Sequence, residues 1–150
     1  MTSIKIPLGS EELSLPIPDG WKIVDTVRPN PHPKLEQVGG ALVDALDHPI
    51  GSATPLRDRD LRHKCIVLCV DDISRPTPIR EYFGAVLEYL LAGGATPENM
   101  LILFGLGAHR DMTVEEVRHK LGDVNLHGIP WHNHAFNDEK KLAHIGTTSR

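Results

Sequence analysis

The sequence predicts an α/β fold in which a parallel βαβ unit forms part of a three-layer, Rossmann-like sheet, preceded by an N-terminal β-hairpin. Two apolar runs, residues 65–70 and 100–104, flank residues 79–90, where apolar side chains recur at helical spacing before a Gly-Gly pair. Strand, helix and strand thus follow within about 40 residues, the length of a βαβ unit. Continuous apolar runs are typical of strands buried on both faces, so we expect residues 65–70 to form a buried strand.

The first 17 residues predict the hairpin. Ile4, Ile6 and Leu8 occupy alternate positions, a Gly-Ser pair interrupts the pattern, and the alternation resumes over residues 13–17.

The segment between hairpin and sheet predicts a loop, a helix and an exposed connection. Three prolines between residues 29 and 33 exclude regular pairing, and apolar residues then recur at helical spacing from Leu35 to Leu46. Residues 49–62 are rich in charge and short of apolar side chains, so we expect them at the surface.

The C-terminal third predicts one more helix. Thr113 and Glu116 have the spacing of a capping box, and a short apolar face follows before Gly122. Residues 124–150 contain no long periodic element.

Composition limits the functional classes. A chain of 150 residues with 40% apolar and 24% charged residues is the size of one domain, so we expect residues 1–150 to form a single N-terminal α/β domain. A net charge of -4 and 5% aromatic residues argue against a nucleic-acid partner. No run approaches the roughly 20 apolar residues of a membrane span, and the N-terminus does not resemble a signal peptide, so we expect no membrane partner and a cytoplasmic location.

The two cysteines lie in the first apolar run. In a strand, Cys65 and Cys69 would stand about 13 Å apart, too far for a disulfide. We expect two buried free thiols in a reducing compartment, and no metal site there.

Ligands of parallel α/β sheets bind beyond the carboxyl ends of the strands. The first loop there, residues 71–78, combines Asp72, Arg75 and Thr77 with prolines. A proline in the first helical turn would leave Arg75 and Thr77 near a helix N-terminus suited to a carboxylate or phosphate. In the alternative, Ser74 or Thr77 caps the helix and an aspartate pairs with Arg75.

The second loop, residues 105–112, carries His109 after two glycines that permit close backbone approach. An imidazole that titrates near pH 6.5 can take and return a proton at neutral pH, which makes His109 the acid/base candidate. The spacing of the glycines lacks the third glycine of a dinucleotide fingerprint, so we reject that cofactor.

The tail is rich in histidine. In a strand, His132 and His134 would share one face, a spacing that some metal sites use. No third ligand is evident, and we assign no metal. A metal hydrolase therefore stays a minor alternative. The histidines are His127, His132, His134 and His144.

Taken together, the two loops resemble the N-terminal signatures of the nickel-dependent lactate racemase family. The matching stretches run from Asp71 to Pro78 and from Gly105 to Glu116, in the same order, each after a strand. The ending, residues 145–150, also resembles the family, so the similarity spans roughly residues 60–150.

The resemblance implies a racemase or epimerase of small 2-hydroxy acids that uses a nickel-pincer nucleotide. In that family a histidine removes the hydroxyl proton while the C2 hydride moves to the cofactor, which gives a planar 2-keto acid. His109 matches one of two acid/base histidines, and Asp72 and Arg75 match the pair that supports substrate and cofactor. Thr77 is a further candidate for the cofactor phosphate.

The chain departs from the family in length, because members are two-domain proteins of more than 400 residues. The second catalytic histidine, the cofactor lysine and the nickel-ligand histidine would all follow Arg150. We therefore expect an N-terminal part that is inactive alone and needs the remainder of the two-domain enzyme. The alternative from another class is a non-catalytic α/β domain that binds an anion or phosphate at Arg75 and Thr77.

Overall fold

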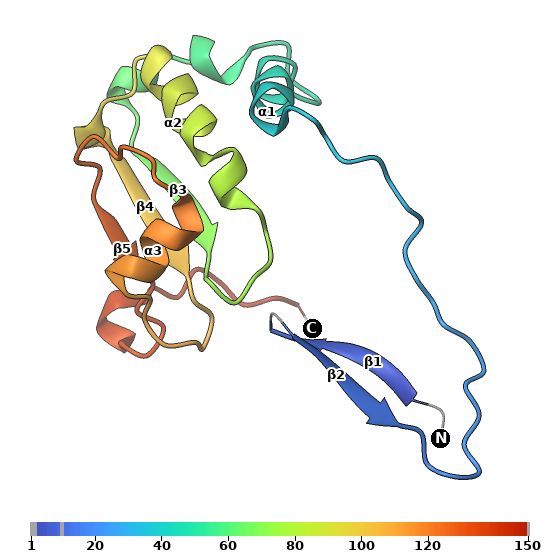
Figure 1. Cartoon of the computed structure of the whole chain (residues 1–150). Helices are drawn as coiled ribbons and strands as arrows, with labels where there is room; N and C mark the ends of the chain where they lie inside the picture. Colours follow the sequence, from blue (N-terminus) through green and yellow to red (C-terminus); the bar gives the residue numbers. More distant parts are fainter. Residues whose placement is uncertain (1–2, 10, 150) are drawn as a thin grey trace. The chain divides into compact units, whose positions relative to one another are not determined.

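The computed structural model describes residues 3–9 and 11–149 (Figure 1). These residues belong to two compact units, with the boundary between Lys34 and Leu35. The first unit contains the predicted hairpin, with β1 (Ser3–Leu8) antiparallel to β2 (Glu11–Pro16). Its register pairs Ile4 with Leu15 and Ile6 with Leu13. These four side chains keep 36–41% of their surface exposed, so the hairpin has no enclosed core of its own.

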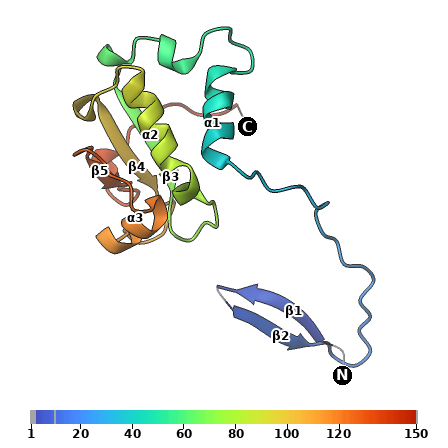
Figure 2. The ribbon, with the colours of Figure 1, turned by 45° about the horizontal axis from the view of Figure 1, so that its top comes forward.

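The second unit is built on a three-stranded parallel sheet in the order β3-β4-β5, as Figures 1 and 2 show. Strands β3 (Ile66–Asp71) and β4 (Met100–Gly105) are the predicted pair, which confirms the α/β class and the βαβ unit. Strand β5 (Trp131–Asn133) pairs with the other edge of β4. At three residues it is too short for its apolar pattern to predict it from sequence.

Three α-helices complete this unit: α1 (Val38–Asp47), α2 (Phe83–Ala92) and α3 (Val114–Leu121). Helix α3 begins at the predicted capping box, where Thr113 Oγ1 accepts from Glu116 N and the Glu116 carboxylate accepts from Thr113 N. Within the described ranges, no helix has the length and apolar character to cross a bilayer. In the described part of the chain, five short 3-10 helices join the elements: Leu56–Asp58, Leu61–His63, Ile79–Glu81, Pro97–Asn99 and Glu139–Lys141.

Helix α2 starts later than its apolar pattern predicts. Residues 79–81 form a 3-10 turn instead, and the α-helix begins only at Phe83. Arg75 and Thr77 each precede a proline, which disfavours the α conformation. The expectation that these two residues lie at an α-helix N-terminus is therefore wrong, and neither Ser74 nor Thr77 caps the helix.

The core lies between one face of the sheet and helices α2 and α3. Ile102 and Phe104 of the central strand are fully buried, and they belong to the same apolar cluster as Leu87 of α2 and Leu121 of α3. Leu61 also enters this core at 4% exposure, so the expectation that residues 49–62 are wholly superficial is wrong at this position.

The opposite face of β3 is open, which contradicts the predicted buried strand. Burial alternates along β3: Val70 is buried, whereas Val67 is 44% exposed and Cys69 is exposed, as is Cys65 directly before the strand. Because the apolar core lies on one face of the sheet, the side chains on the other face of β3 stay exposed, and its apolar run is half-buried despite its continuous hydrophobicity. The expectation of two buried thiols is wrong.

Candidate active site

The two predicted loops leave the sheet side by side. The register pairs Asp71, the last residue of β3, with Gly105, the last residue of β4. Because the strands are parallel, both loops start at the same carboxyl edge. The loops that carry Asp72 and His109 therefore begin as neighbours.

A tight turn directs His109 back toward the first loop. His109 N donates to Leu106 O at 3.0 Å, and Gly107 inside this turn has a φ of +58°. A side chain at that position would be strained, so glycine is required for the turn itself. No atom lies within 4 Å of where a Gly107 Cβ would be, so the glycine leaves the loop surface open.

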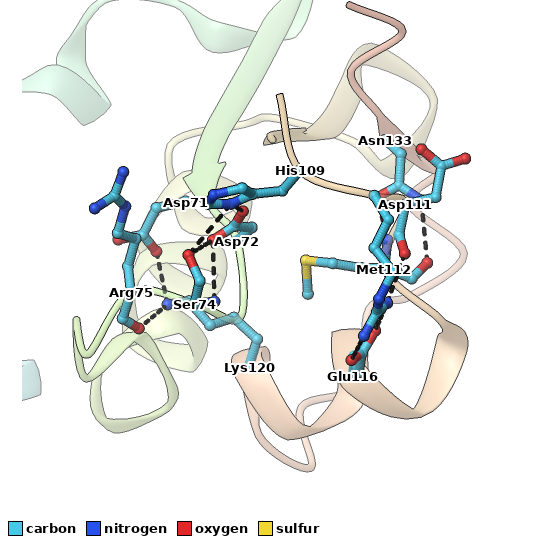
Figure 3. Close-up of polar contacts among 11 residues, drawn as sticks. Asp71, Asp72, Ser74, Arg75, His109, Asp111, Met112, Glu116, Lys120 and Asn133 are labelled. Carbon is cyan, nitrogen blue, oxygen red and sulfur yellow. Dashed lines mark hydrogen bonds and ion pairs between the residues drawn. The ribbon is translucent and has the colours of Figure 1, made fainter. Parts of the chain in front are cut away.

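The structure brings Asp72 and His109 into direct contact. His109 Nδ1 lies 2.5 Å from Asp72 Oδ2, and the two side chains point toward each other in Figure 3. The residues are 37 positions apart in sequence, and they meet only because β3 and β4 are paired. Asp72 is 4% exposed, whereas the His109 side chain is 52% exposed. The buried carboxylate thus supports an imidazole that solvent or a ligand can reach.

Ser74 holds the other oxygen of Asp72. Both the Ser74 amide, at 3.0 Å, and its hydroxyl, at 2.5 Å, donate to Asp72 Oδ1. These bonds are the main reason that the pKa of Asp72 lies below its usual value; burial raises this pKa, and the hydrogen bond with His109 lowers it further. Asp72 is therefore an ionised carboxylate at neutral pH.

The ionisation of Asp72 determines how His109 can act. A carboxylate can only accept hydrogen bonds, so the 2.5 Å contact assigns the proton of a neutral His109 to Nδ1. Nε2 then carries the free lone pair. A neutral imidazole held in this tautomer can take a proton from a hydroxyl group at Nε2.

A hollow of about 280 Å³ opens beside this pair. Its size is suited to a small ligand rather than a polymer. The hollow is lined by Asp72, Ile73, Ser74, His109, Arg110 and Met112.

Arg75 and Thr77 lie in a neighbouring hollow of about 370 Å³. The Arg75 amide donates to Asp72 O at 3.2 Å, but among the described residues its side chain forms no hydrogen bond or ion pair with Asp72 or His109, and its guanidinium points away from His109 in Figure 3. Thr77 donates its hydroxyl proton to Asp71 Oδ2 at 2.5 Å, so that proton is not directed at a ligand. Within residues 3–9 and 11–149, the side chains of Arg75, Arg80 and His119 in this second hollow form no ion pair.

Several residues that the sequence did not indicate support the two loops. Asn133 of β5 accepts from Met112 N and donates to Met112 O, which fixes the end of the second loop. Lys120 is buried at 5% exposure and donates to Arg75 O at 2.8 Å. No sequence pattern could indicate Lys120, because a lysine in a helix is normally assigned to its exposed face.

The tail histidines are not gathered into a cluster. In the described part of the chain, no three His, Cys, Asp or Glu side chains come together as metal ligands. His132 lies in β5 with an exposed side chain, and the other candidates lie outside regular elements. The structure therefore adds no support for the metal hydrolase alternative.

Comparison with known proteins now places this geometry in a family. The protein-family model described as lactate racemase N-terminal domain matches residues 8–150 of this chain. The chain belongs to this family. The match covers both loops of the site, the whole of the sheet β3-β4-β5 and most of the first unit. The resemblance carried by the two loop sequences is confirmed.

Two comparisons with individual proteins agree with the family. The chain is 28% identical over 149 residues to the lactate racemase of Thermoanaerobacterium thermosaccharolyticum, covering 98% of this chain and 34% of that protein. The structure of the lactate racemase apoprotein from the same organism matches with a TM-score of 0.66 and 26% identity, over 99% of this chain and 34% of that one. The chain thus spans about a third of the length of the relative it matches, and it corresponds to that enzyme's N-terminal domain.

Proposed function

We propose that this chain is the N-terminal part of a 2-hydroxy-acid racemase or epimerase that uses a nickel-pincer nucleotide. The observation that carries the proposal is the contact between Asp72 and His109, which joins the two loops that match the lactate racemase family. Residues 1–150 would act as one domain of that enzyme, and the remainder of the longer protein would complete the site.

We assign each residue a role that its position supports. His109 Nε2 takes the proton of the substrate hydroxyl, and Asp72 holds the imidazole in the required tautomer. Arg75, whose guanidinium has no ion pair among the described residues, binds the substrate carboxylate. Loss of a proton from the hydroxyl and a hydride from C2 converts the 2-hydroxy acid into a planar 2-keto acid, which can be reduced from either face.

The residues present fit a cofactor that carries a phosphate. Arg75, Arg80, His119 and Lys120 line the second hollow, and no carboxylate is among its lining residues. Arginines are well suited to phosphate, so Arg80 is the residue that would hold this group beside Arg75, which is kept for the substrate carboxylate, with Thr77 a weaker candidate. When bound, the cofactor supplies the hydride chemistry at C2.

Isotope labelling of a full-length protein that carries this chain tests the proposal. A 2-hydroxy acid such as D-lactate, labelled with deuterium at C2, is converted in ordinary water in the presence of the nickel-pincer nucleotide. Hydride transfer predicts an L-product that retains deuterium at C2, because the hydride does not exchange with solvent. Loss of the label would indicate proton abstraction at carbon and overturn the mechanism, and absence of conversion would overturn the function.

A second candidate function is supported by the same basic hollow. A non-catalytic domain could use Arg75 and Arg80 to bind a phosphate or carboxylate. It predicts thermal stabilisation of the chain by inorganic phosphate, together with no turnover and no cofactor binding in any longer form. The exposed imidazole of His109 on a buried carboxylate favours the racemase, since anion binding has no need of that pair.

A further inference from the structure

Helix α3 contacts both loops of the candidate site through two side chains that are one helical turn apart. Glu116 in its first turn pairs with Arg110, the residue after His109. Lys120, four residues further along, contacts the loop that carries Arg75. Residues at this spacing lie on the same side of a helix.

Lys120 binds two points of the first loop. Its ammonium donates to Arg75 O at 2.8 Å and lies 2.8 Å from Asp71 Oδ1. That carboxylate oxygen is shut off from solvent, and among the described residues the Lys120 ammonium is its only polar partner. Asp71 Oδ2 accepts from the Thr77 hydroxyl. The Lys120 ammonium therefore connects Asp71 at the start of the loop with Arg75 in its middle, and Asp71 in turn holds Thr77 near its end.

A lysine is a costly choice for this position if it serves only to hold α3 on the sheet. Its neighbours Val117 and Leu121 belong to the apolar core, and an apolar side chain could extend that core. Burying an ammonium requires desolvation that a single ion pair often does not offset, so buried pairs are weak evidence for added stability. The geometry that Lys120 gives to the backbone of Arg75 is the better explanation.

Glu116 makes the matching contact on the second loop. Its two carboxylate oxygens accept from Arg110 Nη1 at 2.9 Å and Nη2 at 2.7 Å, which is a bidentate arrangement. The Arg110 guanidinium lowers the pKa of Glu116 to about 2. The loop that carries His109 is thereby attached to the same helix as the loop that carries Arg75.

We propose that Lys120 and Glu116 are positioning residues: α3 uses them to set Arg75 and His109 relative to each other. The effect on turnover rests on the proposed function, whereas the effect on loop order does not. Lys120→Met keeps most of the length of the side chain and removes its charge, and Lys120→Arg keeps the charge. Arg118→Met on the exposed side of α3 is the matched control, as is Glu115→Gln for Glu116→Gln.

The first measurement is amide hydrogen exchange in the full-length protein. The Arg75 amide donates to Asp72 O, and the Ser74 amide donates to Asp72 Oδ1. In Lys120→Met both amides are expected to exchange at least about tenfold faster, because the loop loses its anchor. Amides of α2 such as Leu87 should keep their rates, and Arg118→Met should behave as wild type. Unchanged exchange at Ser74 and Arg75 would overturn the role of Lys120, whether or not the protein is a racemase.

The second measurement determines KM and kcat separately for the conversion of a 2-hydroxy acid, with each rate divided by the amount of folded protein. Lys120→Met should mainly raise KM, since Arg75 is proposed to bind the carboxylate, and Lys120→Arg should recover part of the loss. Glu116→Gln should mainly lower kcat, since the base is displaced. Misplacement by about 1 Å can cost roughly 10²-fold. Equal loss of kcat in both variants with KM unchanged would overturn the positioning roles.

If Lys120→Met does not fold, Lys120→Gln serves instead: its amide is polar enough for the buried position, but it loses the ion pair with Asp71 and reaches less far toward Arg75 O. Faster exchange at Ser74 and Arg75 is again expected, and unchanged exchange would overturn the role of Lys120. If the wild-type protein interconverts no 2-hydroxy acid, the proposed function has failed, and the exchange rates alone decide whether α3 positions the loops.

Discussion

The carboxylate of Asp72 accepts a hydrogen bond from the imidazole of His109, with 2.5 Å between Oδ2 and Nδ1. If this contact sets the tautomer of a catalytic base, Asp72→Asn should lower kcat by roughly 10²–10⁴-fold, because an amide can present its NH₂ group and reverse the tautomer. Steady-state rates of 2-hydroxy-acid interconversion in the full-length protein measure this. Asp123→Asn is the control, since Asp123 is exposed and forms no ion pair in the described ranges. A variant at position 72 with full kcat would remove Asp72 from the mechanism.

The lowered pKa of Asp72 also predicts how stability depends on pH. A carboxyl group with a lower pKa in the folded than in the unfolded chain stabilises the fold when it is ionised. That contribution is complete above the unfolded value, about 3.9, and is lost as the pH falls through the folded value. Wild type should therefore unfold at higher urea than Asp72→Asn at pH 5, and the difference should shrink toward pH 2. A difference in urea midpoint that stays constant from pH 5 to pH 2 would show that the pKa of Asp72 is the same in the folded and the unfolded chain.

Both loops and the strands before them could be predicted from sequence because each element carries a local pattern. The apolar runs, the helical spacing after residue 79 and the Thr113–Glu116 box depend on near neighbours in the chain. Because the carboxyl ends of parallel strands lie at the same edge of a sheet, the two loops that follow these strands could be predicted to lie together. The contact between Asp72 and His109 is the consequence of that arrangement, realised through the register of β3 with β4.

The parts that could not be predicted depend on partners distant in sequence. The burial of Lys120 requires Arg75 O and Asp71 as acceptors, 45 and 49 residues earlier, and α3 alone gives no sign of them. Strand β5 is defined by its pairing with β4, which its own three residues do not indicate. Nothing in the sequence indicates that Arg75 and His109 line two different hollows. The cysteines are exposed because their side chains lie on the face of the sheet away from the apolar core, and the sequence does not show which face is covered.

The position of Phe104 in the core between the sheet and the helices predicts that the stability of the fold depends strongly on its side chain. This side chain is fully buried on the central strand and meets Trp131 edge to face, with 6.0 Å between ring centroids. Phe104→Ala should lower the free energy of unfolding by about 3–5 kcal/mol, since it removes apolar contacts and leaves a cavity. Phe136, 37% exposed, is the matched control, and Phe136→Ala should cost much less. Urea unfolding of the two variants provides the comparison; similar losses would contradict the position of the core.

The open face of β3 predicts two reactive thiols. Cys65 and Cys69 are exposed, in contrast to the buried thiols that the apolar run suggested. In the native chain, both should react with a thiol reagent such as dithionitrobenzoate at rates close to those in denaturant, because access and not unfolding limits the reaction. Cys65→Ser and Cys69→Ser assign the two reactions, and a thiol that reacts only after denaturant is added would contradict its exposure. The same rates in a longer form of the protein report on whether its remaining part covers this face of the sheet: protection of Cys69 there, with free reaction in the chain alone, would place the rest of the enzyme against β3.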